Sequence, residues 1–238
     1  MRELPTGTLT MLFSDIEGST VLLSRLGTRY GEALSAQRAV LRAAISDWRG
    51  HELGTEGDSF FVVFESAADA VGCCVAAQRA LGGHAWPGGV AVRVRMGLHS
   101  GEPSRHEDGY IGMDVHRAAR IAATAHGGQV VLSGVTWELA HSVLPAELSV
   151  RDLSLHRLKD IDGPERIYQL AGHCGGRIRC GTAVRAAGGH GQAGLRGDRG
   201  KRGRHRGHLP AAGRAATGDR AGGLAGPATV RQGSACPA

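Results

Sequence analysis

The fold is decided by residues 8–20, which read TLTMLFSDIEGST. Leu9 to Phe13 form an apolar run of strand length, and Asp15 follows at its end. Gly18, Ser19 and Thr20 then open a helical pattern. A carboxylate beside helix-start amides suits a cation together with a phosphate, because the amides point at anionic oxygens while the carboxylate holds the neutralising metal. On this stretch alone, an equally good interpretation is that Asp15 caps the helix.

A second acid lies in residues 54–64, GTEGDSFFVVF, where Asp58 directly precedes another apolar run. A Gly-Asp turn between two short runs predicts the tip of a β-hairpin. If the two strands are neighbours, Asp15 and Asp58 converge. Two carboxylates that hold one or two Mg²⁺ ions are an arrangement for displacement at phosphorus. The alternative is that both acids only cap turns.

Five blocks together carry a resemblance to a known family. In chain order they read FSDIEGST, EGDSFFVVF, RMGLHSGE, YIGMDVHRAAR and HGGQVVLS. Their order and spacing resemble the catalytic domain of class III nucleotidyl cyclases of the bacterial type, from about Leu9 to Leu170.

The hydrophobic periodicity predicts alternating helices and strands across the same region. Ser66 and Ser133 are expected to cap helices. The order β-α-α-β-β-α-β with closing strands predicts an α+β fold with a ferredoxin-like split βαβ core and extra strands, which the resemblance also implies. The expected helices are 21–25, 30–48, 66–81, 113–125 and 133–140; the expected strands are 51–54, 59–64, 90–101, 129–132, 148–155, 156–160 and 166–170, with a polar loop at 103–109.

Composition divides the chain into a domain, residues 1–173, and a tail, residues 174–238. The tail holds 12 of the 28 basic and 2 of the 22 acidic residues, so it carries a net charge of +10 and the domain carries −4. It has 17 glycines and no aromatic residue, so it cannot bury enough apolar area to fold and is predicted to be disordered.

Two interpretations of this tail remain open. The chain contains no Asn and only two Lys against 26 Arg, which is typical of a GC-rich gene. The tail then resembles GC-rich DNA read out of frame, which makes it a frameshifted remnant of a longer protein. The alternative is a basic tail, and only this tail would support a nucleic-acid-binding role.

No apolar run approaches the roughly 18–20 residues that a membrane span needs, and the N-terminus is polar, so a soluble cytoplasmic protein is expected. The five cysteines form no Cys-x-x-Cys pair. Adjacent Cys73 and Cys74 are expected in the core.

The resemblance implies a site for two divalent cations, Mg²⁺ or Mn²⁺, held by Asp15, Asp58 and the Ile16 carbonyl. One metal would activate the ribose 3′-hydroxyl and the other would hold the triphosphate. The amides of Gly18, Ser19 and Thr20 would contact phosphate oxygens.

Further along the chain, Arg120 matches the family's transition-state arginine, whose planar fork suits charge on the α-phosphate. A surface helix arginine is the alternative. Lys159 loosely matches a phosphate-binding lysine, and a solvated lysine is an equal alternative.

Three positions depart from the family pattern. The base-selecting lysine, four residues before the second metal acid, is Gly54. The second base-selecting position is Gly109, with Asp108 beside it. The transition-state asparagine, four residues before the arginine, is His116, whose N–H can still orient a ribose. Metal and phosphate handling are therefore retained, while base recognition is lost or rebuilt.

The resemblance implies a head-to-tail homodimer with shared active sites, no membrane, and a purine nucleoside triphosphate as substrate. The first hypothesis is a slow or base-relaxed cyclase that makes a 3′,5′-cyclic nucleotide and pyrophosphate from ATP or GTP. The second is a catalytically degenerate domain that binds nucleotide or dimerises and regulates attached modules.

Overall fold

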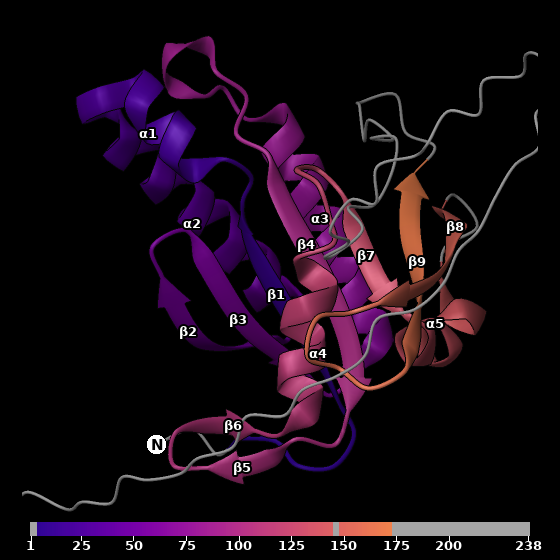
Figure 1. Cartoon of the computed structure of the whole chain (residues 1–238). Helices are drawn as coiled ribbons and strands as arrows, with labels where there is room; N and C mark the ends of the chain where they lie inside the picture. Colours follow the sequence, from indigo (N-terminus) through magenta and orange to yellow (C-terminus); the bar gives the residue numbers. More distant parts are fainter. Residues whose placement is uncertain (1–3, 145–147, 173–238) are drawn as a thin grey trace, which may run out of the picture. The chain divides into compact units, whose positions relative to one another are not determined.

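The computed structural model describes residues 4–144 and 148–172, and the tail predicted at 174–238 lies outside them. A seven-stranded sheet runs in the order β2-β3-β1-β4-β7-β9-β8 (Figure 1). Its pairs are antiparallel except for β4 with β7. The strands are β1 (Leu9–Ile16), β2 (His51–Glu56), β3 (Ser59–Phe64), β4 (Val94–Gly101), β7 (Val130–Ser133), β8 (Leu148–Arg157) and β9 (Pro164–Gly172), with a separate hairpin of β5 (Ser104–His106) and β6 (Gly109–Ile111). The helices are α1 (Ser19–Leu26), α2 (Tyr30–Asp47), α3 (Ala67–Gly83), α4 (Met113–Ala122) and α5 (Gly134–Ala140), and 3₁₀ turns lie at Gly27–Arg29, Pro87–Gly89 and His141–Val143.

Helices cover both faces of the sheet, so the central strands are apolar on both sides. Leu12 and Leu132 face the larger core, to which α1, α2, α3 and α5 contribute. The neighbouring residues Met11 and Val131 face the opposite side, where α4 packs through Ala118 and Ile121. This α+β sandwich confirms the predicted fold class.

Both predicted helix caps are confirmed, because Ser66 Oγ accepts from the Asp69 amide and Ser133 Oγ from the Thr136 amide. Cys73 and Cys74 are buried in the larger core, as expected. No helix within the described ranges is long and apolar enough to cross a membrane.

Several expected boundaries were wrong: the first strand runs on to Ile16, the helix expected at 113–125 ends at Ala122, and three further differences have a physical reason. The strand expected at 90–101 begins at Val94, because its partner β1 ends at Ile16, opposite Val94. The expected loop 103–109 contains β5 and the start of β6, whose three-residue strands are too short to show alternation. The strand expected at 156–160 is the end of β8 followed by a turn, and a register shift between Asp152 and Leu155 disguised the continuity of β8.

Candidate active site

Two carboxylates lie near the end of β1. Asp58 lies in the turn between β2 and β3, where Gly57 takes the left-handed φ of +59° that favours glycine. Its Oδ2 accepts a hydrogen bond of 2.9 Å from the Ile16 amide, directly after Asp15. Buried Gln37 holds the turn by donating to the Asp58 carbonyl over 3.2 Å. Long-range pairing of β1 with β3 therefore brings Asp58 to the residue that follows Asp15, across 42 positions of the chain.

Arg95 of β4 is the arginine that binds Asp15, and its role was not predicted from the sequence. β1 and β4 pair so that Arg95 stands opposite Asp15, and the guanidinium binds both carboxylate oxygens, with Nη2 to Oδ2 at 2.7 Å. The bond to Asp15 raises the pKa of Arg95 against the opposing effect of burial, with further attraction from Glu17 and Asp58. In the sequence, Arg95 is only a basic residue within the strand expected at 90–101, and such a pattern does not specify which residue of a neighbouring strand lies opposite it.

The donor set fits a hard divalent cation. Carboxylate and carbonyl oxygens at Asp15, Asp58 and Ile16 are the ligand type that Mg²⁺ and Mn²⁺ prefer. Within residues 4–144 and 148–172, no group of three or more His, Cys, Asp or Glu side chains is arranged to hold a metal. Two carboxylates alone leave coordination positions for substrate oxygens, but Arg95 must release Asp15 before that acid binds a cation.

The expected phosphate-binding turn lies next to these acids. Gly18 adopts the left-handed φ of +66° and is the N-cap residue of α1, which begins at Ser19 and includes Thr20. No side chain caps this helix start. Its amides suit an anion because they carry the positive end of the helix dipole.

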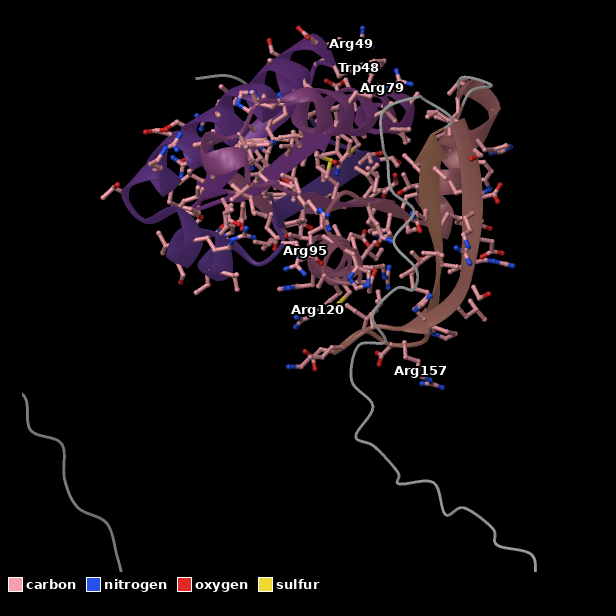
Figure 2. The ribbon with its side chains drawn as sticks, turned by 90° about the horizontal axis from the view of Figure 1, so that it is seen from above. Trp48, Arg49, Arg79, Arg95, Arg120 and Arg157 are labelled. Atoms are coloured by element: carbon pink, nitrogen blue, oxygen red, sulfur yellow. The ribbon has the colours of Figure 1, made fainter. Side chains whose placement is uncertain are left out.

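Two further charged candidates, Arg120 and Lys159, lie near the β8–β9 turn. Arg120 Nη2 on α4 pairs with Asp160 Oδ2 at 2.9 Å, and exposed Lys159 is the neighbour of Asp160 in the chain. His116, one helical turn before Arg120, is exposed. Figure 2 labels Arg95 and Arg120, which come from different elements and lie on the side of the view away from Trp48.

The positions expected to select the base lie on or beside short outer strands. Gly54 falls at the register shift of β2, and a Cβ added there would contact nothing within 4 Å. Asp108 is exposed in the β5–β6 turn, and Gly109 begins β6, also with open space around a Cβ. Both glycine positions have room for a larger side chain, so the packing of this chain does not require glycine at either.

A family model described as the adenylate and guanylate cyclase catalytic domain matches residues 1–171. The chain belongs to this cyclase family. The match confirms the resemblance drawn from the five sequence blocks.

Curated relatives of this cyclase domain include an uncharacterised protein of Mycobacterium tuberculosis, 36% identical over 168 residues, which cover 70% of this chain and 56% of that protein. The chain therefore spans about half the length of the first curated relatives it matches. An adenylate cyclase of Neurospora crassa is 29% identical over 225 residues, covering 71% of this chain and 10% of that enzyme.

Solved cyclase structures share the fold. An adenylate cyclase of Trypanosoma brucei in its monomeric state aligns with a TM-score of 0.67 and 26% identity, covering 78% of this chain and 95% of that one. The adenylyl cyclase CyaB of P. aeruginosa aligns with a TM-score of 0.60 and 23% identity, covering 73% and 100%. A guanylate cyclase domain of Catenaria anguillulae, solved in complex with GTP, aligns with a TM-score of 0.61 and 21% identity, covering 69% and 96%. These last two structures are under 25% identical to this chain and show the fold alone.

Proposed function

We propose that this domain is a nucleotidyl cyclase that converts ATP or GTP to the 3′,5′-cyclic nucleotide and pyrophosphate. The observation that carries the proposal is the bond between the Asp58 carboxylate and the Ile16 amide, which places the second acid beside Asp15. The two acids lie at one strand end, next to the start of α1, where no side chain caps the backbone amides. Carboxylates that can hold a metal beside amides that can bind phosphate oxygens suit a metal-bound triphosphate.

Asp15, Asp58 and the Ile16 carbonyl would hold the divalent cations. When bound, these cations supply charge neutralisation of the triphosphate and a lowered pKa for the ribose 3′-hydroxyl. Gly18, Ser19 and Thr20 would orient phosphate oxygens through their amides. Arg95, once it releases Asp15, is placed to take a phosphate instead, because its guanidinium fork matches either anion.

The transition-state groups would be Arg120 and His116 of a partner subunit in a homodimer, with Lys159 as a further phosphate contact. Within one chain, Arg120 is neutralised by Asp160. That pair is largely exposed and therefore contributes little, about 0–1 kcal/mol, so an approaching triphosphate can displace Asp160.

A second candidate function is a catalytically degenerate domain that binds nucleotide or dimerises as a regulatory module. Gly54, Gly109 and His116 favour it, because a glycine offers no side-chain bond to a base and a lost transition-state contact typically costs about 10²–10³-fold in rate. We also propose that the catalytic domain is residues 1–173, with residues 174–238 as a separate tail.

The test is cyclic nucleotide production by the full chain at high protein concentration, with Mn²⁺ and either ATP or GTP. Asp58→Asn keeps the size of the side chain and should abolish product. Asp152→Asn is the matched control, since Asp152 is an acid paired with Arg166 on the exposed edge strand β8. No product from a protein shown by sedimentation to be dimeric would favour the regulatory module.

A further inference from the structure

One face of β4 is shaped to receive α4. Gly97, His99 and Gly101 alternate along the strand and therefore point to the same side. A Cβ at Gly97 would lie 2.3 Å from the Ala122 Cα, and a Cβ at Gly101 would lie 2.3 Å from Asp114 Oδ2. The block GLHSG, residues 97–101, therefore forms the surface against which α4 packs, and α4 carries His116 and Arg120.

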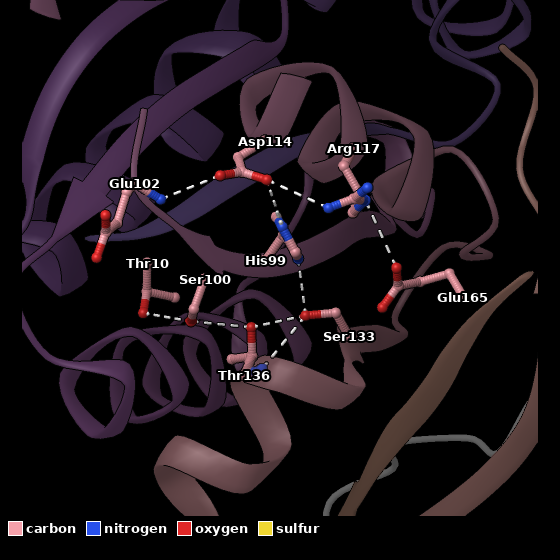
Figure 3. A network of polar contacts seen from close by, with 9 residues as sticks. All are labelled: Thr10, His99, Ser100, Glu102, Asp114, Arg117, Ser133, Thr136 and Glu165. Carbon is pink, nitrogen blue, oxygen red and sulfur yellow. Dashed lines mark hydrogen bonds and ion pairs between the residues drawn. The ribbon is translucent and has the colours of Figure 1, made fainter. Parts of the chain in front are cut away.

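His99 lies between the two glycines and is only 1% exposed. Its Nδ1 is 2.9 Å from Ser133 Oγ, and its Nε2 is 3.3 Å from Asp114 Oδ1 (Figure 3). Burial lowers the pKa of His99, although the bond to Asp114 opposes this effect. The ring is therefore neutral near pH 7 and carries a single N–H.

Asp114 decides which nitrogen holds that hydrogen. An ionised carboxylate only accepts, so Nε2 must donate to Asp114. Nδ1 is then an acceptor, and the Ser133 hydroxyl must donate to it. This directs the single Ser133 hydrogen toward the ring and leaves its oxygen to accept from the Thr136 amide at 3.3 Å.

The same rule fixes every hydroxyl behind Ser133. Once the Ser133 hydrogen points to His99, Thr136 Oγ1 must donate to Ser133 (3.0 Å), Ser100 Oγ to Thr136 (3.0 Å) and Thr10 Oγ1 to Ser100 (2.8 Å), because each hydroxyl has one hydrogen. The result is a one-way hydrogen-bonded chain from β1 through β4, α5 and β7 to His99 (Figure 3). Ser133, His99 and Asp114 are arranged like a catalytic triad, in which the serine is the nucleophile. Ser133 is fully buried, however, so no substrate can reach it.

Asp114 transmits this arrangement to α4. It lies in the first turn of the helix, where the helix dipole favours a carboxylate. Asp114 Oδ2 accepts a hydrogen bond from the Glu102 amide at 3.0 Å, and Asp114 Oδ1 contacts Arg117 at 3.2 Å. Arg117 also pairs with half-buried Glu165 of β9 at 3.5 Å. The helix start is therefore bonded to both β4 and β9.

We propose that His99 is a positioning residue for cyclisation: its Nε2–H, fixed by the Ser133 hydroxyl, holds Asp114 and so sets where α4 presents Arg120 and His116. The inference rests on the proposed function. The two residues on α4 are assigned to the transition state, so misplacing the helix lowers kcat rather than weakening binding of the nucleotide.

The test compares kcat and KM of the full chain carrying His99→Leu, Ser133→Ala or His99→Gln, with Mn²⁺ and whichever nucleotide is turned over. His99→Leu removes both ring bonds, and a displacement of about 1 Å at α4 is expected to lower kcat by about 10²-fold with KM within about twofold. Ser133→Ala, the variant that keeps the imidazole, should lower kcat by about tenfold. His99→Gln restores a donor and an acceptor and should recover most of the wild-type kcat.

A second readout does not need turnover. Nitrogen NMR of the ring should show hydrogen on Nε2 and none on Nδ1, and hydrogen exchange of the α4 amides should be faster in His99→Leu and Ser133→Ala but not in His99→Gln. If the wild type makes no cyclic nucleotide yet shows these exchange changes, the cyclase proposal fails while the positioning of α4 by His99 stands. A ring hydrogen on Nδ1, or unchanged kcat and unchanged α4 exchange in both disrupting variants, would overturn the inference.

Discussion

Gly97→Ala tests how tightly α4 is seated on the sheet. The added Cβ would lie 2.3 Å from the Ala122 Cα and 2.4 Å from its amide nitrogen. Carbon atoms in normal contact are about 3.5–4.0 Å apart, so the Cβ would lie about 1.2–1.7 Å too close to the Ala122 Cα. Because both opposing atoms are backbone, no rotamer change relieves it, and the whole helix must move.

Overpacking of this kind typically costs about 1–3 kcal/mol, and the rigid contact places Gly97→Ala at about 3 kcal/mol. For a domain of this size that corresponds to a fall in Tm of about 6–12 °C. Urea unfolding followed by circular dichroism gives the free energy of unfolding. If the chain is a cyclase, the same shift of α4 should lower kcat by about 10²-fold.

Gly31→Ala is the matched control. Gly31 lies in the first turn of α2, and a Cβ there would meet nothing within 4 Å. Alanine should leave the free energy of unfolding unchanged or raise it by up to about 1 kcal/mol, since it favours the helix. A free energy of unfolding for Gly97→Ala within about 0.5 kcal/mol of the wild type, with unchanged exchange of the α4 amides, would show that α4 is not tightly seated on Gly97.

Three further outcomes are expected. Because burial lowers the pKa of His99, the unfolded chain binds the proton first as pH falls below about 6.5. The free energy of unfolding should therefore fall by up to about 1.4 kcal/mol per pH unit until the pKa of the folded state is passed. Urea unfolding from pH 7.5 to 5 would measure this loss, which should be smaller in His99→Gln. Burial raises the pKa of Cys73 to about 12 and also raises that of Cys74, so both should resist alkylation at pH 8 until urea is added; mass spectrometry that found either labelled in the native protein would contradict this. Arg95→Gln frees both Asp15 oxygens, so Mn²⁺ should bind about fivefold more tightly, the equivalent of about 1 kcal/mol. Calorimetry would measure the affinity, and an affinity equal to that of the wild type would show that Arg95 does not compete with the metal.

Much of the candidate site was predictable because its signals are local. Asp15 follows an apolar run and Asp58 lies in a Gly-Asp turn, so the residues around each acid predict that it lies near the end of a strand. The caps at Ser66 and Ser133 were predictable for the same reason, since each bond spans only three residues. The family blocks added the roles expected of Arg120, Lys159 and the substituted positions.

Local patterns in the sequence were enough to predict the helix caps at Ser66 and Ser133, the two acids near strand ends and the burial of Cys73 and Cys74, because each depends on spacing along the chain. Three contacts became visible only in the folded structure: Arg95 with Asp15, Arg120 with Asp160, and His99 with Asp114. Each of those contacts depends on strand register or on the docking of α4. A slip of one residue turns every side chain of a strand to the other face, and nothing in a one-dimensional pattern of polar residues specifies that register.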